Sequence, residues 1–443
     1  MIVAESQHDS GKMGVSANPG WVRGYCPFKE NRLELKNQHG SLCAARRTGR
    51  FLFVPAVSTY NKPYLTFEQQ LELLKKRGME IAAGAEPAVL AGLRRIGYYR
   101  LSAYWYPLRK TDESRGSSVQ RLDDFRHGAT FGQVLGLYEF DKRLRLLVLD
   151  AIELVEVSLR VSIAYHLGRR DPFAHMKPEL LHGGFVKKAK SLRGVQGHGS
   201  SRPGRSEQAT DYDDWLRKHD EVVSRSKEVF VQHYLKKYGE PLPIWVSIEL
   251  WEFGMLTRFF GGMKNEDQEE IASQYEVPGA NVLESWLRTM NVLRNVAAHH
   301  GRLWNRIIAF PPRLPPRGGR QDLDFLWELP EGSKGRLFSR LSILLYLVSV
   351  IDPESSWPLG LRELLGNFPE IPELSLADMG FPQGWTSLPL WARCLERSSM
   401  KDTGGSPETV IAAEPRNPYT VYPARGEVIT SAHVRRLMDE GGV

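Results

Sequence analysis

The segment TFGQVLGLYEFDKRLRLLVLDAIELVEVSLRVSIAYHL, residues 130–167, decides the fold that we expect for this chain. Apolar residues recur in it every three or four positions, which is the spacing of one face of an α-helix. They are Leu137, Phe140, Leu144, Val148, Ile152, Val155, Leu159 and Ile163, and His166 continues the series. The charged residues expected on the opposite face are Asp141, Lys142, Arg145, Glu153, Glu156 and Arg160. The pattern predicts one long helix, or two helices separated by a kink.

Shorter helical patterns lie on both sides of this segment. Thr66 and Gln69 have the spacing of a capping box and predict a helix over 67–77. Further helices are predicted over 86–95, 212–238, 244–263, 266–275 and 335–351, and from Asn281 towards Asn305. A polar stretch over 109–130 is expected to be a loop. Since strands do not alternate with helices, we expect an all-α (mainly α) bundle with additional N-terminal helices and irregular termini.

Changes in composition divide the chain into five parts. A helical domain is expected over 131–351 and contains a basic loop at 183–207, and a helical segment over 58–130 precedes it. Residues 1–57 are interpreted as a loosely ordered extension, with a small separate module as the alternative. Residues 352–397 are rich in Pro and Trp and are expected to wrap irregularly around the body, and 398–443 are expected to be a flexible tail.

Composition narrows the class of protein. The 443 residues are 42% hydrophobic, which argues against a disordered chain. Three cysteines do not suffice for a disulfide framework, and neither a signal peptide nor an apolar run of about 20 residues is found, so we expect a cytoplasmic protein without a membrane segment. The net charge is +7 and is concentrated: residues 183–207 carry six Lys or Arg against one Glu, and residues 302–340 carry eight against four Asp or Glu. This distribution is compatible with a phosphate-bearing partner.

The stretch NVLRNVAAHHGRLWNR, residues 291–306, is the most informative for chemistry. Asn295 and His299 are four residues apart and share a helical face, with Arg302 close by and Arg294 able to reach back towards the imidazole. Histidine can exchange a proton at neutral pH, and a guanidinium can stabilise the charge of a phosphoryl transition state. Such a pair suits phosphodiester cleavage of RNA, whose 2′-hydroxyl supplies the nucleophile. The alternative is structural, since cations are common at helix C-termini.

Other catalytic signatures are missing from the sequence. It contains no GxxxxGK[ST], HExxH or GxSxG pattern, and no GxGxxG pattern in a strand–helix context.

The motif Arg294-Asn295-x-x-x-His299 resembles the R-N-x-x-x-H motif of HEPN ribonucleases. Its wider context resembles the Abi family, of AbiD/AbiF type, whose members are abortive-infection proteins of phage resistance. The pieces that carry this resemblance are YNKP (60–63), LT (65–66), IGYYRLS (96–102), YW (104–105), YEFDKRLR (138–145), residues 153–168 ending AYHLG, and RNVAAHHGRLWNR (294–306). The resemblance covers about residues 60–350.

The resemblance implies a helical HEPN fold that forms a homodimer in which two R-x4-H motifs meet. It implies metal-independent cleavage of RNA without a cofactor, leaving a 2′,3′-cyclic phosphate, as a toxin-like response to infection. The implied partners are RNA, a second copy of the chain and possible regulation by a noncoding RNA or an antitoxin, with no membrane. The rival hypothesis is a non-catalytic RNA-binding or dimerisation protein that uses the same scaffold.

Carried onto this sequence, the resemblance makes Arg294 and His299 catalytic. Supporting roles are assigned to Asn295, His300, Glu153, Glu156 and Arg302, and RNA-binding roles to Lys187, Lys188, Lys190 and Arg306. Two of these assignments have structural alternatives. Glu156 and Arg160 can form an ion pair on the helix surface, and the aromatic segment 98–106, which could stack on bases, can equally belong to the core.

Overall fold

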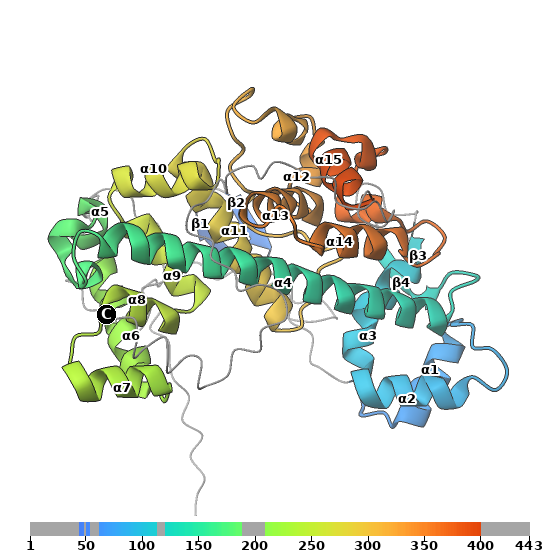
Figure 1. The fold of residues 1–443 in the computed structure, drawn as a ribbon. Helices are drawn as coiled ribbons and strands as arrows, with labels where there is room; N and C mark the ends of the chain where they lie inside the picture. Colours follow the sequence, from blue (N-terminus) through green and yellow to red (C-terminus); the bar gives the residue numbers. More distant parts are fainter. Residues whose placement is uncertain (1–43, 48–49, 54–61, 113–119, 188–208, 400–443) are drawn as a thin grey trace, which may run out of the picture. The chain divides into compact units, whose positions relative to one another are not determined.

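The computed structural model describes residues 44–47, 50–53, 62–112, 120–187 and 209–399 (Figure 1). The chain divides into two units, residues 1–64 and 65–443. In the first unit, the strands β1 (Ala44–Arg47) and β2 (Arg50–Phe53) pair antiparallel. A short hairpin therefore lies where we expected a loosely ordered extension, because four-residue strands are too short to show a periodic pattern. The predicted tail over 398–443 falls, apart from its first two residues, outside the described residues.

The helix α4 (Phe131–Gly168) is the longest element of the second unit and is unbroken over its 38 residues. The side chain of Thr130 accepts a hydrogen bond from the Gln133 amide, and Gln133 returns one to the Thr130 amide, so a complete capping box starts the helix. At 1.5 Å per residue it is about 57 Å long. Of the two predicted alternatives, one long helix is correct.

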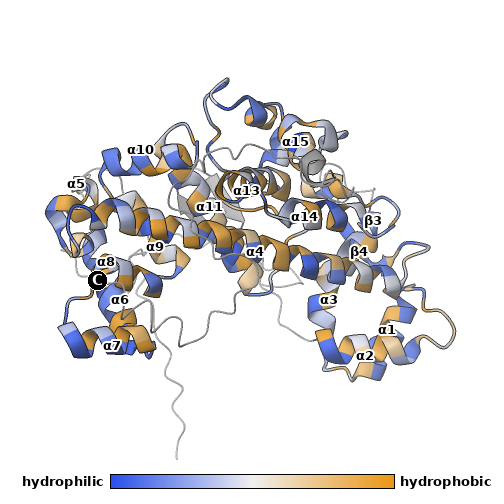
Figure 2. Cartoon of the chain, in the orientation of Figure 1, coloured by the Kyte–Doolittle hydropathy of each residue, from blue (hydrophilic) through white to orange (hydrophobic). Residues whose placement is uncertain are grey.

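The burial of α4 differs in one respect from the prediction. Its apolar series lies in the core, and Figure 2 shows apolar residues spread along the helix. Asp141 and Arg145, which we expected on the exposed opposite face, are 0% and 4% exposed. The prediction was wrong for these two residues because α4 is covered on more than one side, by α3, α11, α13 and α14.

The helices before α4 are α1 (Phe67–Lys76), α2 (Glu86–Ile96) and α3 (Tyr98–Trp105). The capping box of Thr66 and Gln69 is present as predicted. The expected loop over 109–130 contains a hairpin, β3 (Arg109–Asp112) and β4 (Gln120–Phe125). Both sheets are small, so the mainly α class is confirmed for the part of the chain described above.

The helices after α4 follow the predicted order with extra breaks. They are α5 (Gly183–Val186), α6 (Asp211–Arg225), α7 (Val229–Tyr238), α8 (Ile244–Ser247), α9 (Phe253–Gly262), α10 (Asn265–Gln274), α11 (Ala280–Ala298), α12 (Glu331–Lys334) and α13 (Leu337–Ile351). Short 3₁₀ turns join several of them. The helix α13 is buried almost all round, as expected for a helix that is apolar on every face.

The irregular wrap predicted over 352–397 is wrong, because this segment contains the helices α14 (Trp357–Gly366) and α15 (Pro389–Ser399). Pro358 and Pro389 lie in the first turns of these helices, where proline starts a helix instead of interrupting it. The indole nitrogen of Trp391 donates to Ser342 of α13, and that of Trp357 donates to the carbonyl of Leu147 of α4. Both helices therefore belong to the core. No helix of the described residues has the length and apolar character needed to cross a membrane.

Candidate functional site

The helix α11 carries the R-x4-H motif at its C-terminal end. One face of α11 packs into the core through Leu283, Leu287, Met290 and Leu293. Its last turn holds Arg294, which is partly exposed, and Asn295, which is exposed. The burial of the apolar face fixes α11 and leaves the motif side chains at the surface.

The end of α11 differs from the predicted continuation towards Asn305. The helix stops at Ala298, and His300 adopts a left-handed conformation with φ of 56°. The amide of Gly301 donates to the carbonyl of Val296 at 2.7 Å, and the amide of His300 donates to that of Ala297 at 3.0 Å. These two bonds define a Schellman motif with His300 where glycine is usual. His300 and Arg302 therefore do not lie on a further turn of α11, as we had assumed.

His299 and Arg294 lie at this helix end without a direct contact among the described interactions. His299 is the C-cap residue, its amide donates to the carbonyl of Asn295 at 3.0 Å, and its side chain is exposed. A guanidinium nitrogen of Arg294 lies 3.5 Å from the side-chain oxygen of Asn295, so the contact is long. Within one chain, the structure brings Asn295 close to Arg294.

Glu156 on α4 is a partly buried carboxylate on which the charge of Arg294 acts. Its Oε1 lies 2.5 Å from Arg160, whose other contact is the carbonyl of Trp251 at 3.0 Å. Burial raises the pKa of Glu156, while the positive charges of Arg160 and Arg294 act to lower it. The Glu156–Arg160 ion pair expected as the structural alternative is present, and the charge of Arg294 also acts on Glu156. Glu153 is exposed.

Arg302 is an anchor of the loop that follows α11. It donates to the carbonyl of Ala103 on α3 at 2.5 Å, and burial lowers its pKa. Arg100 of α3 donates to the carbonyl of His300 at 2.7 Å. Two arginines therefore hold this loop against α3, and the guanidinium of Arg302 is used for this attachment.

A buried polar cluster centred on Asp141 holds the next residues of the loop. Asp141 Oδ1 accepts hydrogen bonds from the amides of Leu303 at 3.0 Å and Trp304 at 2.8 Å. Asp141 Oδ2 accepts from the hydroxyl of Tyr104 at 2.7 Å and from Arg145. Burial raises the pKa of Asp141, and these four donors act against that rise. The cluster joins α3, α4 and the loop, and thereby fixes the backbone that follows His299.

Sequence reasoning missed this cluster, although a signal was present. Asp141 and Arg145 are spaced i, i+4 within the resembling segment YEFDKRLR, and Tyr104 lies in another resembling segment. We had interpreted the pair as part of a solvated face, since such pairs usually lie there.

Of the four expected RNA-binding residues, the structure describes Lys187 and Arg306. Lys187 is exposed and follows α5, which Figure 1 shows near the C-terminal end of α4. Arg306 is exposed and follows the loop that is attached to α3 and to Asp141, which lies in the N-terminal part of α4. Lys188 and Lys190 lie outside the described residues. The basic loop therefore remains an expectation.

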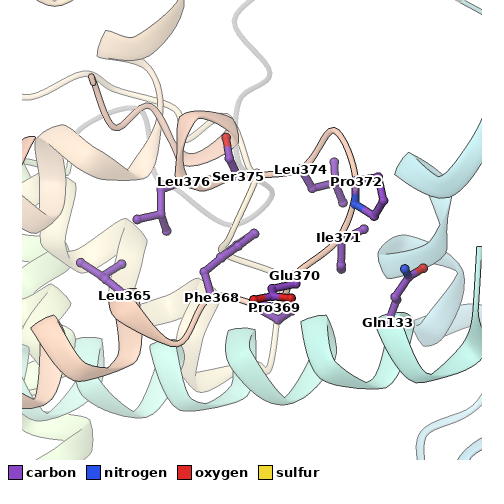
Figure 3. A pocket seen from close by; sticks show the side chains of 10 residues that line it. All are labelled: Gln133, Leu365, Phe368, Pro369, Glu370, Ile371, Pro372, Leu374, Ser375 and Leu376. Atoms are coloured by element: carbon purple, nitrogen blue, oxygen red, sulfur yellow. The ribbon is translucent and has the colours of Figure 1, made fainter. Parts of the chain in front are cut away.

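A pocket of about 710 Å³ lies against the N-terminal half of α4 (Figure 3). Its lining residues are Gln133 of α4 and Leu365, Phe368, Pro369, Glu370, Ile371, Pro372, Leu374, Ser375 and Leu376 from α14 and the segment after it. No residue of the R-x4-H motif or of the Asp141 cluster lines it, so it is separate from the candidate site.

Comparison with known proteins defines the class of this protein. Residues 91–305 match the family of Abi-like proteins, so this region of the chain belongs to the Abi family, as the resemblance implied. The match extends from α2 to the loop after α11 and includes the motif and the Asp141 cluster. No curated protein and no solved structure matches the chain. Membership of this family indicates a role in abortive infection, the defence of bacteria against phage.

Proposed function

We propose that this protein is a metal-independent RNA endonuclease of HEPN type that acts in abortive infection, with Arg294 and His299 as its catalytic residues. The observation that carries the proposal is the position of the motif. It lies at the surface end of a helix whose following loop is held by Arg100, Arg302 and the buried Asp141 cluster. Such a fixed backbone would present His299 in one place while leaving its side chain accessible to a large substrate.

The chemistry follows from the two side chains. His299 would take the proton of an RNA 2′-hydroxyl while that oxygen attacks the adjacent phosphorus. Arg294 would stabilise the additional negative charge on the phosphoryl oxygens. The bond to the 5′-oxygen then breaks, and this oxygen receives a proton from a second imidazole. The products are a 2′,3′-cyclic phosphate and a 5′-hydroxyl end.

A second copy of the chain would supply the second imidazole. An exposed apolar row runs along α4 at a spacing of four residues: Val157, Val161 and Tyr165 are 48%, 46% and 40% exposed. Glu156, on which the charge of Arg294 acts, directly precedes Val157 at the start of this row. We propose that two copies pack through this row, because apolar side chains on one helix face gain free energy when removed from water. The pairing would bring two R-x4-H motifs together.

The rival function, RNA binding or dimerisation without catalysis, is favoured by one observation. Arg294 contacts Asn295 and its charge acts on Glu156, His299 is exposed, and no hydrogen bond joins Arg294 to His299 among the described interactions. A regulatory noncoding RNA or an antitoxin remains part of the proposal under either function.

A cleavage assay separates these two functions. Wild type, Arg294→Ala and His299→Ala are incubated with RNA in the presence of EDTA, and the new ends are analysed for 2′,3′-cyclic phosphate. Arg288→Ala is the matched control, since Arg288 is exposed on the same helix. We expect cleavage by the wild type and the control only. Cleavage that persists in both motif variants refutes the catalytic assignment, and RNA binding without cleavage by any of the four proteins supports the rival.

A further inference from the structure

Tyr99 of α3 is the most exposed large hydrophobic side chain among the described residues, at 91%. Its neighbours in α3 are held in place: Leu101, Tyr104 and Trp105 are buried, and the ring of Tyr98 packs edge-on against that of Trp105. Tyr104 and Trp105 are explained by their packing in the core. Tyr99 is too exposed to have such a packing role.

Tyr99 is also fixed relative to the R-x4-H motif. The next residue, Arg100, donates to the carbonyl of His300 at 2.7 Å. One turn later, the carbonyl of Ala103 accepts from Arg302 at 2.5 Å. Tyr99 and Ala103 are four residues apart and share a face of α3. The exposed ring therefore lies on an element that is bonded to the two residues on either side of Gly301, next to His299.

We propose that Tyr99 is a positioning residue that stacks on an unpaired base of the RNA next to the scissile phosphate, an inference that rests on the proposed function. Every base has an aromatic face, so a single exposed ring can bind single-stranded RNA without reading its sequence. Arg100 brings a positive charge to the same end of α3, which favours a polyanion. The substrate class is thereby narrowed to single-stranded or looped RNA.

The test compares Tyr99→Ala, Tyr99→Phe and the control Tyr238→Ala, which removes another exposed tyrosine, 54% exposed on α7. Loss of stacking should raise KM for single-stranded RNA about 5- to 100-fold in Tyr99→Ala with kcat little changed. Tyr99→Phe keeps the ring and should behave as the wild type. Because Tyr99 is exposed, all three variants should unfold at the same temperature as the wild type.

A binding measurement separates this inference from the catalytic proposal. In the His299→Ala background, RNA with 2-aminopurine beside the cleavage position should lose fluorescence on binding, and Tyr99→Ala should restore it. If the wild type cleaves RNA and Tyr99→Ala changes neither KM nor the fluorescence, the stacking role is refuted while the proposed function stands. If Tyr99→Ala instead dissociates a dimer, the ring is a protein contact and the inference is wrong. If the wild type neither binds nor cleaves RNA, both proposals fail together.

Discussion

His175 and His219 are buried side by side, and we expect them to make the fold sensitive to acid. His175 is 0% exposed and His219 4% exposed, and their ring centroids lie 5.1 Å apart. The indole of Trp251 donates to Nδ1 of His219 at 3.1 Å, and Trp215 stacks on the ring of His219. Both histidines are thus enclosed by aromatic side chains, where a positive charge is poorly solvated.

The sign and size of the effect follow from the pKa values. Burial lowers the pKa of His175 to about 3 and that of His219 to about 4, whereas an unfolded histidine has a pKa near 6.5. Since the folded-state values are depressed, the unfolded chain binds more protons, and stability falls as the pH drops below about 6.5. At pH 5 each histidine costs about 2 kcal/mol relative to high pH, so the pair lowers the free energy of unfolding by about 3 to 4 kcal/mol between pH 7 and 5.

The assay is urea unfolding at pH 7, 6 and 5, followed by the fluorescence of tryptophan. The variant His175→Phe/His219→Gln removes both imidazoles and keeps an acceptor for Trp251, and His233→Gln is the control at an exposed histidine. Buried carboxyls such as Asp141, whose pKa is raised, oppose the loss and are common to all the proteins. The double variant should therefore lose about 3 to 4 kcal/mol less than wild type over this range. A parallel decline of both proteins with pH would refute the reasoning.

Three further predictions concern the site. Asp141→Asn weakens the hydrogen bonds to Leu303, Trp304 and Tyr104 and leaves Arg145 buried without its counter-charge; it should cost about 3 to 5 kcal/mol in chemical denaturation, and an unchanged midpoint would contradict the structure. Val161→Arg should give a monomer by light scattering and abolish cleavage, whereas Val229→Arg, at an 80% exposed valine on α7, should do neither. His300→Gly removes the left-handed strain and should raise the free energy of unfolding by about 1 kcal/mol while cleavage persists, and a loss of cleavage with RNA binding intact would give the imidazole of His300 a chemical role.

The long helix α4 could be predicted because two independent signals agree. Thr130 and Gln133 mark its start, and the apolar residues keep a helical spacing to its end. The same pattern predicted that Asp141 lies on the exposed face of α4, whereas it is buried. Periodicity locates the most apolar face of a helix, and it does not show whether a neighbouring helix also covers another face. The residue types and spacing of Asp141 and Arg145 are also those of a surface ion pair, so the sequence does not distinguish a buried pair from an exposed one.

The end of α11 could not be predicted for a different reason. The residue that ends a helix in the left-handed conformation is usually glycine. Here His300 adopts this conformation, and Gly301 follows it. The Schellman bonds are made by backbone groups, so His300 can take the position at a cost in strain. The expected geometry of His300 and Arg302 failed together, because both were placed on a helical turn that the chain does not make.

Three of the segments that carry the family resemblance meet at the Asp141 cluster. Tyr104, Asp141, Arg145 and the amides after Arg302 come from three separate resembling segments, and their contacts fix a loop without including Arg294 or His299. The match over residues 91–305 therefore covers this scaffold as well as the R-x4-H motif. Substitutions in the Asp141 cluster and substitutions in the R-x4-H motif should therefore have different effects on stability. Asp141→Asn should lower stability and cleavage together, whereas His299→Ala, at an exposed residue, should remove cleavage and leave stability unchanged. If His299→Ala lowers stability as much as Asp141→Asn does, the motif belongs to the scaffold, and the binding function without catalysis becomes the better account.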